Sequence, residues 1–146
     1  MDGIHVLRYL MSDPGQGILL SRSAYFSLKA YSNSNWAACD NSRKSVTYFF
    51  ITLGGSHVSW KSKKQLTISL SSAEAEYKAL RMVVVELSWL CRLLGDIGSF
   101  ISAHVLVHCY SQAALYIAKN HFTSRERTLT LTTIFFVIVF SPVSFP

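Results

Sequence analysis

The sequence predicts an α/β fold, in which helices cover a mixed β-sheet. β-Branched and aromatic residues fill positions 46–53, which is typical of a strand. Apolar residues recur at alternating spacings of four and three from 73 to 94, which is typical of a helix packed on a sheet. An apolar strand pattern over 103–110 precedes another helical segment. With 146 residues, 50% of them hydrophobic, the chain has the size of one domain with a core.

Before position 71 the sequence predicts one short helix followed by strands. The helical pattern ends at Asp13-Pro14-Gly15, and Gly54-Gly55 turns one strand back as a hairpin. Asn33 to Asn35 interrupt a strand pattern, and we interpret them as a strand-end loop because Asn is common in turns. The expected elements are a helix at 4–11 and strands at 18–20, 25–32, 46–53 and 57–62.

The long helix is expected to begin at Ser71 or Ser72, either of which is a natural N-cap. Two glutamates stand in its first turns. Glu74 lies four residues before a lysine, so we expect an ion pair on an exposed face. Glu76 borders the apolar stripe, so it is the carboxylate that faces the sheet.

Beyond the long helix, positions 103–110 predict a strand buried on both faces, and 111–119 predict a helix capped by Ser111. The apolar run at 134–140 resembles a short buried strand. It falls far below the roughly 18–20 residues of a membrane-spanning helix, so we expect no membrane partner.

The chain carries 14 Lys and Arg against 8 Asp and Glu, a net charge of +6. Basic residues gather at Arg43-Lys44 and at 61–64, which suits a polyanionic partner as well as a solvated surface. The three cysteines form no CxxC pair, which argues against a zinc site and a disulfide framework. The N-terminus lacks the pattern of a secretory signal, so we expect an intracellular protein, cytoplasmic or nuclear.

Seven short words occur in a specific order along the sequence. They are VLRYL with PGQG, LKAYSNSNWA, CDNSRKS, VSWKSKKQ, SLSSAEAEYKAL, ELSWLCRLL and HCYSQAALYIAKN. Together they resemble the RNase H domain that follows the reverse transcriptase in Pol polyproteins of copia-type LTR retrotransposons. The resemblance extends from about Val6 to Thr128. Each word alone is weak evidence, but seven in order are specific.

The resemblance implies an RNase H-like fold and cleavage of the RNA strand of an RNA–DNA hybrid with two Mg2+ ions. Such chemistry needs several carboxylates that converge on the ions, because hard divalent cations take oxygen ligands. Domains of this kind have Asp at the positions of Asn33, Asn35 and Tyr110. Glu76 is the surviving candidate for a catalytic and metal-binding carboxylate.

We therefore interpret the chain as a degenerate and truncated RNase H domain. One carboxylate facing two divalent ions leaves most of their charge uncompensated, so we expect no stable metal binding and no nuclease activity. The expected division is residues 1–24 as a remnant of the segment that links reverse transcriptase to RNase H, 25–128 as the RNase H-like domain, and 129–146 as a diverged apolar tail.

Other hypotheses stay open. The domain could be a residually active ribonuclease H, an unrelated protein that uses its apolar run as an interfacial strand, or a partner of a reverse transcriptase domain in another chain. It could also be a non-catalytic module for a hybrid or duplex backbone, since such contacts depend on charge rather than sequence. The residues expected to bind nucleic acid are Arg43, Lys44, Trp60, Lys61, Lys63 and Lys64.

Overall fold

The computed structural model describes residues 2–15, 17–18, 20–22, 27–99, 104–125 and 135–140. The chain forms an alternation of helices and strands within these ranges. The elements are α1 (Asp2–Ser12), β1 (Leu28–Asn35), β2 (Val46–Leu53), β3 (Ser56–Lys64), α2 (Ser72–Asp96), β4 (His104–Cys109), α3 (Gln112–Arg125) and β5 (Phe135–Phe140).

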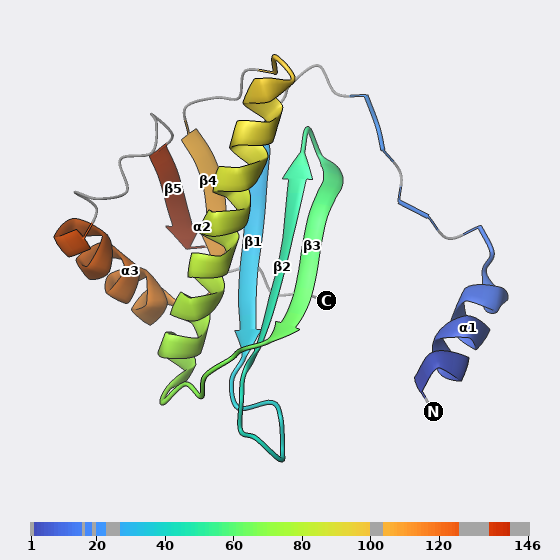
Figure 1. The fold of residues 1–146 in the computed structure, drawn as a ribbon, viewed down its shortest axis with the longest axis horizontal. Coiled ribbons are helices and arrows are strands. Elements are labelled where there is room, and N and C mark those ends of the chain that lie inside the picture. The colour runs from blue at the N-terminus through green and yellow to red at the C-terminus, as the bar shows by residue number, and fades with distance from the viewer. Residues whose placement is uncertain are drawn as a thin grey trace.

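The strands form one mixed sheet in the order β3-β2-β1-β4-β5 (Figure 1). β1 and β3 each pair antiparallel with β2, whereas β4 runs parallel to β1, and β5 runs parallel to β4. The predicted RNase H-like order, with three antiparallel strands, a long helix, and then a strand and a helix, is confirmed. Figure 1 shows α2 lying in front of the sheet, with α3 to one side of it.

The β2–β3 hairpin forms where the sequence predicts it. Gly54 and Gly55 have φ angles of 58° and 89°, which glycine adopts at little cost because it has no Cβ. The pairing register shifts between Ile51 and Thr52, which is the mark of a β-bulge. The hairpin therefore determines which side chains of the edge strand β3 face α2.

One hydrophobic core joins the sheet to the helices. α3 contributes Ala114 and Ala118 to the same cluster that α2 fills, so both helices pack on one face of the sheet. Ser71 caps α2 and Ser111 accepts from the amide of Ala114 at the start of α3, as predicted. The buried members of the cluster are Leu28, Ala30, Phe49, Ile51, Leu80, Val83, Leu87, Leu90, Cys91, Val105, Val107, Cys109, Ala114 and Ala118.

Three local predictions are wrong. β1 continues through Asn35, so Asn33 to Asn35 lie in a strand rather than a loop, because β2 pairs with them and outweighs their turn preference. Ile18 and Leu20 lie in no strand and are exposed. β4 alternates buried and half-buried residues, because within the described ranges no helix covers the second face of the sheet.

The segments outside the central domain differ in their packing. The side chains described in α1 are all exposed, and Figure 1 shows this helix apart from the sheet. The apolar run expected as a strand forms β5 over 135–140, at the edge of the sheet beside β4. The domain boundaries after residues 24 and 128 stay predictions. Among the described residues, none of the helices has the length and apolar character that a membrane crossing needs.

Candidate functional site

Glu76 lies in the first turns of α2 and faces the end of β1, as predicted. Its side chain is 8% exposed. Its Oε1 atom accepts a hydrogen bond from the backbone amide of Ser34 at 3.0 Å. Glu74 instead lies on the outer face, where it forms the expected ion pair with Lys78 at 2.9 Å.

Asn33 converges with Glu76 on the same backbone amide. Its Oδ1 atom accepts from the amide of Ser34 at 2.7 Å, so two acceptors from β1 and α2 meet at one donor. Asn35 is exposed at the last position of β1. Among the described side chains, no hydrogen bond joins Asn35 to Glu76, so the structure brings Asn33 but not Asn35 to the glutamate.

Tyr110 follows β4, which runs parallel to β1. The register pairs Ser32 with Cys109, so Tyr110 reaches the same edge of the sheet as Asn33. Both residues line a pocket of about 160 Å³. The ends of β1 and β4 and the start of α2 therefore gather Asn33, Tyr110 and Glu76, as the resemblance implies.

The electrostatic surroundings of Glu76 favour its neutral form. Burial raises the pKa of this carboxyl, and the hydrogen bond from Ser34 offsets only part of the rise. Its Oε2 atom is buried without a hydrogen-bond partner. Burial, followed by the charge of Glu76, raises the pKa of Cys109 to about 11, so this nearby thiol adds no negative charge to the site.

The residues present do not fit a pair of Mg2+ ions. Mg2+ in proteins is held by carboxylates together with water or phosphate oxygens. Within the described residues, no group of three or more His, Cys, Asp or Glu side chains could hold a metal ion. Asn33 supplies an amide and Tyr110 a phenol, so Glu76 is the one carboxylate that these three residues could offer to two such ions, and burial raises its pKa.

The sequence interpretation missed two polar neighbours of this site. The hydroxyls of Ser32 and Ser34 are buried and have no hydrogen-bond partner. Leu28 and Ala30 point into the core, so alternation along β1 sends Ser32 and Ser34 to the same side as Glu76. The signal in the sequence was the alternation of inward and outward positions along β1, which continues through position 34. Interpreting Asn33 as the start of a loop ended that alternation too early.

The structure divides the residues expected to bind nucleic acid between two faces. Lys61 and Lys63 pair with Phe49 and Thr47, both of which are buried toward α2, so these lysines share that face. Trp60 and Lys64 point to the opposite face, and the tryptophan is 60% exposed. The third group, Arg43-Lys44, lies in the loop between β1 and β2.

Lys64 also has a local partner that the sequence did not predict. Its Nζ atom lies 3.0 Å from Sγ of Cys39. Hydrogen bonds from Ser42 and then from Lys64 lower the pKa of the Cys39 thiol to about 6. Lys64 is therefore held against the β1–β2 loop, whereas Lys61 and Lys63 are free of any carboxylate among the described side chains.

Comparison with known proteins gives these positions a context. No family model matches the chain. The retrovirus-related Pol polyprotein from transposon RE2 of Arabidopsis thaliana is 37% identical over 127 residues, which are 86% of this chain and 9% of that polyprotein. The corresponding polyprotein from transposon TNT 1-94 of Nicotiana tabacum is 36% identical over 115 residues, 79% of this chain and 8% of the polyprotein.

The chain is a homologue of retrovirus-related Pol polyproteins. It spans less than a tenth of the length of these two relatives. The solved structure of LC11-RNase H1, isolated from compost, is 17% identical to this Pol homologue and superposes with a TM-score of 0.48. That superposition covers 80% of this chain and 84% of the other.

Proposed function

We propose that this Pol homologue is an RNase H-like domain that does not cleave nucleic acid by a two-metal mechanism. One observation carries the proposal: the buried Glu76 shares the Ser34 amide with the amide side chain of Asn33, and the residue that follows β4 at the same edge of the sheet is Tyr110 rather than an acid. Two divalent ions at this place would face at most one negative charge. The fold would thus support a structural or binding role without hydrolysis.

A cleavage assay tests this proposal directly. The full chain, incubated with a labelled RNA–DNA hybrid and either Mg2+ or Mn2+, should leave the RNA strand intact. The Glu76→Gln variant should behave identically. Metal-dependent cleavage by the unmodified chain that disappears in Glu76→Gln would instead establish a residually active ribonuclease H.

Restoring the missing carboxylates provides a second test. The double variant Asn33→Asp with Tyr110→Asp should gain a midpoint of thermal unfolding that rises with Mn2+ concentration, because ligands that bind the folded state stabilise it. A control with Tyr116→Asp adds a carboxylate on the exposed outer face of α3 and should gain no such dependence. An equal response in the unmodified chain would contradict the proposed loss of the metal site.

A second candidate function is non-catalytic binding of a hybrid or duplex backbone. The observation that favours it is the row of exposed lysines on β3, because the one ion pair among the described side chains joins Lys78 to Glu74 and leaves Lys61 and Lys63 without an acidic partner. Phosphate contacts of this kind are sequence-independent and weaken steeply with salt. Arg43 and Lys44, in the loop between β1 and β2, would extend the contact beyond the end of the sheet, whereas Trp60 and Lys64 lie on the opposite face.

Fluorescence anisotropy with a labelled hybrid measures this binding. Replacing Lys61 and Lys63 together with Ala should weaken binding and reduce the slope of log affinity against log salt by about two. Arg92→Ala, which removes an exposed cation from α2, is the matched control and should change the slope less. No binding of the unmodified chain at low salt would eliminate this function.

A further inference from the structure

The face of the sheet turned away from α2 carries a set of aromatic side chains, which we call the aromatic face. The pairing register places Phe50 opposite both Tyr31 and Trp60, and Tyr31 opposite His108. Within the described ranges no helix covers this face. Its members are Tyr31, Tyr48, Phe50, His57, Trp60 and His108.

Four rings of the aromatic face stack across four strands. Tyr31 lies 4.6 Å from His108 and 4.5 Å from Phe50 between ring centroids, with interplanar angles of 9° and 12°. Phe50 continues the stack to His57 at 5.4 Å and 10°. Offset stacking at these separations is favourable, so the rings support one another in fixed positions and do not need a covering helix to order them.

A pocket opens beside this stack. It has a volume of about 160 Å³, and Tyr31, Tyr48, Phe50 and Tyr110 supply aromatic walls. Asn33 also lines it, and its Oδ1 atom is already held by the amide of Ser34. The Nδ2 group is then the part of the amide that remains to donate a hydrogen bond. The pocket suits a planar ring that carries hydrogen-bond acceptors at its edge.

The charge around the pocket favours an anionic partner. Lys29 lies two residues before Tyr31 on the same side of β1, and after burial its charge is the second cause that lowers the pKa of His108. Lys64 of β3 lies on the same face of the sheet, paired with Val46 of β2. No acidic side chain occurs among the residues that the register assigns to this face: Lys29, Tyr31, Asn33, Asn35, Val46, Tyr48, Phe50, Thr52, His57, Trp60, Ser62, Lys64, Leu106 and His108.

We propose that the aromatic face binds single-stranded nucleic acid, with one unpaired base in the pocket beside Asn33 and an adjoining phosphate near Lys29. Aromatic side chains can stack on any base or contact its edge, and lysine side chains bind the phosphates of the backbone. A duplex would not fill the pocket, because its bases are stacked and paired. The inference holds whether or not the domain cleaves a hybrid, because it uses the opposite face of the sheet from Lys61 and Lys63.

A binding assay with matched tyrosine variants tests the proposal. The probe is a fluorescein-labelled 12-nucleotide single-stranded RNA, titrated with the full chain at low salt and followed by anisotropy. Tyr48 is 39% exposed and lies outside the four-ring stack, so Tyr48→Ala should weaken binding about tenfold while the fold persists. Tyr48→Phe keeps the ring and should bind within about twofold of the unmodified chain.

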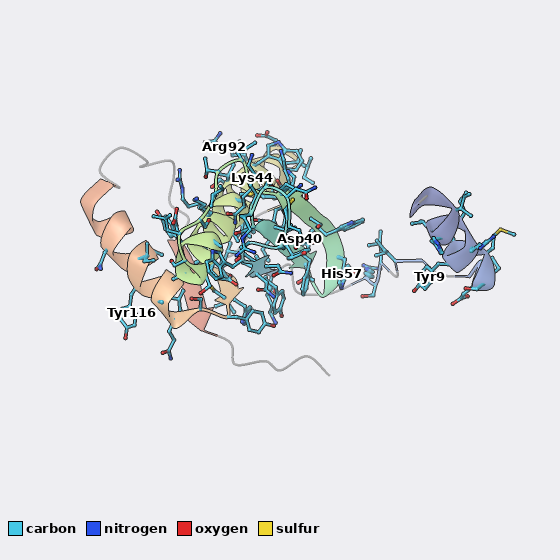
Figure 2. The ribbon with its side chains drawn as sticks, turned by 90° about the horizontal axis from the view of Figure 1, so that it is seen from below. Tyr9, Asp40, Lys44, His57, Arg92 and Tyr116 are labelled. Carbon is cyan, nitrogen blue, oxygen red and sulfur yellow. The ribbon has the colours of Figure 1, made fainter. Side chains whose placement is uncertain are left out.

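The control is Tyr116→Ala, which removes a tyrosine that is 69% exposed on α3. Figure 2 shows Tyr116 projecting from this helix, on the other side of the molecule from His57 of β3. This variant should bind normally. Lys29→Ala should reduce the salt slope by about one, as expected for one lost phosphate contact. Circular dichroism of every variant verifies that the fold is retained.

Two outcomes would overturn the inference. One is equal affinity of Tyr48→Ala and the unmodified chain, or an equal loss in Tyr116→Ala. The other is a concentration-dependent dimer, seen by sedimentation, that Tyr48→Ala dissociates and the single strand does not displace, since the face would then contact a second copy. Loss of hybrid binding with retained Tyr48-dependent single-strand binding would reject only the duplex-binding function.

Discussion

At Glu76, burial and neutral neighbours act on the same carboxyl group. The side chain is fixed by one hydrogen bond from Ser34, while its Oε2 atom has no partner. Burying an ionised group without enough hydrogen bonds or opposite charges costs free energy, so the ionised form of Glu76 destabilises the folded state.

This instability predicts a pH-dependent effect of Glu76→Gln. Burial raises the folded-state pKa of Glu76 above the ordinary value of 4.5. The contribution of this carboxyl to the free energy of unfolding is therefore fully present below pH 4.5, and it is lost as the pH rises through the folded-state pKa. The substitution should therefore raise the free energy of unfolding by about 1 kcal/mol at pH 7 and by little at pH 4. Urea unfolding at both pH values measures the difference.

Glu74→Gln is the matched control. The hydrogen bond from Lys78 lowers the pKa of Glu74, so its contribution is present above the unfolded pKa and is lost as pH falls through the folded pKa. This variant should not be stabilised at pH 7. A Glu76→Gln variant that is less stable than the unmodified chain at pH 7 would contradict the prediction, because the ionised carboxylate would then be compensated in the folded state.

At the scale of elements, α2 organises the domain because hydrogen bonds hold its first turns against the sheet. Its first turn is capped by Ser71, which accepts from the amide of Glu74, while Glu74 accepts from the amide of Leu70. The buried Gln65 side chain bonds both Thr47 of β2 and the carbonyl of Ala75. These contacts fix the start of the helix against the sheet, and so place Glu76.

The cap gives a prediction for the helix. Ser71→Ala should lower the free energy of unfolding by about 1 kcal/mol, because the amide of Glu74 loses its acceptor. Ser72→Ala replaces the adjacent exposed serine, which follows the cap, and should change stability by less than about 0.5 kcal/mol. Thermal unfolding of the two variants side by side makes the comparison. Equal losses would contradict the assignment of Ser71 as the N-cap.

At the scale of the whole molecule, the two faces of the sheet have different surroundings. One face packs against α2 and α3 in the shared core, and the other is the exposed aromatic face. Glu76, Asn33 and Tyr110 lie at the edge where these surfaces meet. Lys61 and Lys63 therefore lie on one face and the aromatic face lies on the other, so the two proposed binding surfaces are separate.

The lack of fit for Mg2+ gives a prediction for the intact chain. Its midpoint of thermal unfolding should be the same in excess EDTA and in millimolar Mg2+, because a ligand shifts stability only if it binds the folded state. Near-UV circular dichroism during heating should show one cooperative transition in both buffers. A midpoint that rises with the logarithm of Mg2+ concentration would reveal surviving ligands.

Local patterns in the sequence predicted β2, the hairpin at Gly54-Gly55 and the long helix, because their signals are strong and mutually consistent. They also predicted that Glu76 faces the sheet, because it borders the apolar stripe of the helix. They failed at Asn33, where pairing with β2 extends the strand against the turn preference. A weak local preference was overridden by hydrogen bonds to a neighbour that is distant in sequence.

The sequence by itself determined most of the elements and their order, the homology with Pol polyproteins and the absence of acids at positions 33, 35 and 110. These follow from residue identity and from short periodic patterns. The tertiary structure alone decided that Asn33 and Glu76 share one amide, that the basic residues divide between two faces, and that four rings form a stack. Those facts depend on strand register, because a shift of one residue sends every side chain to the other face.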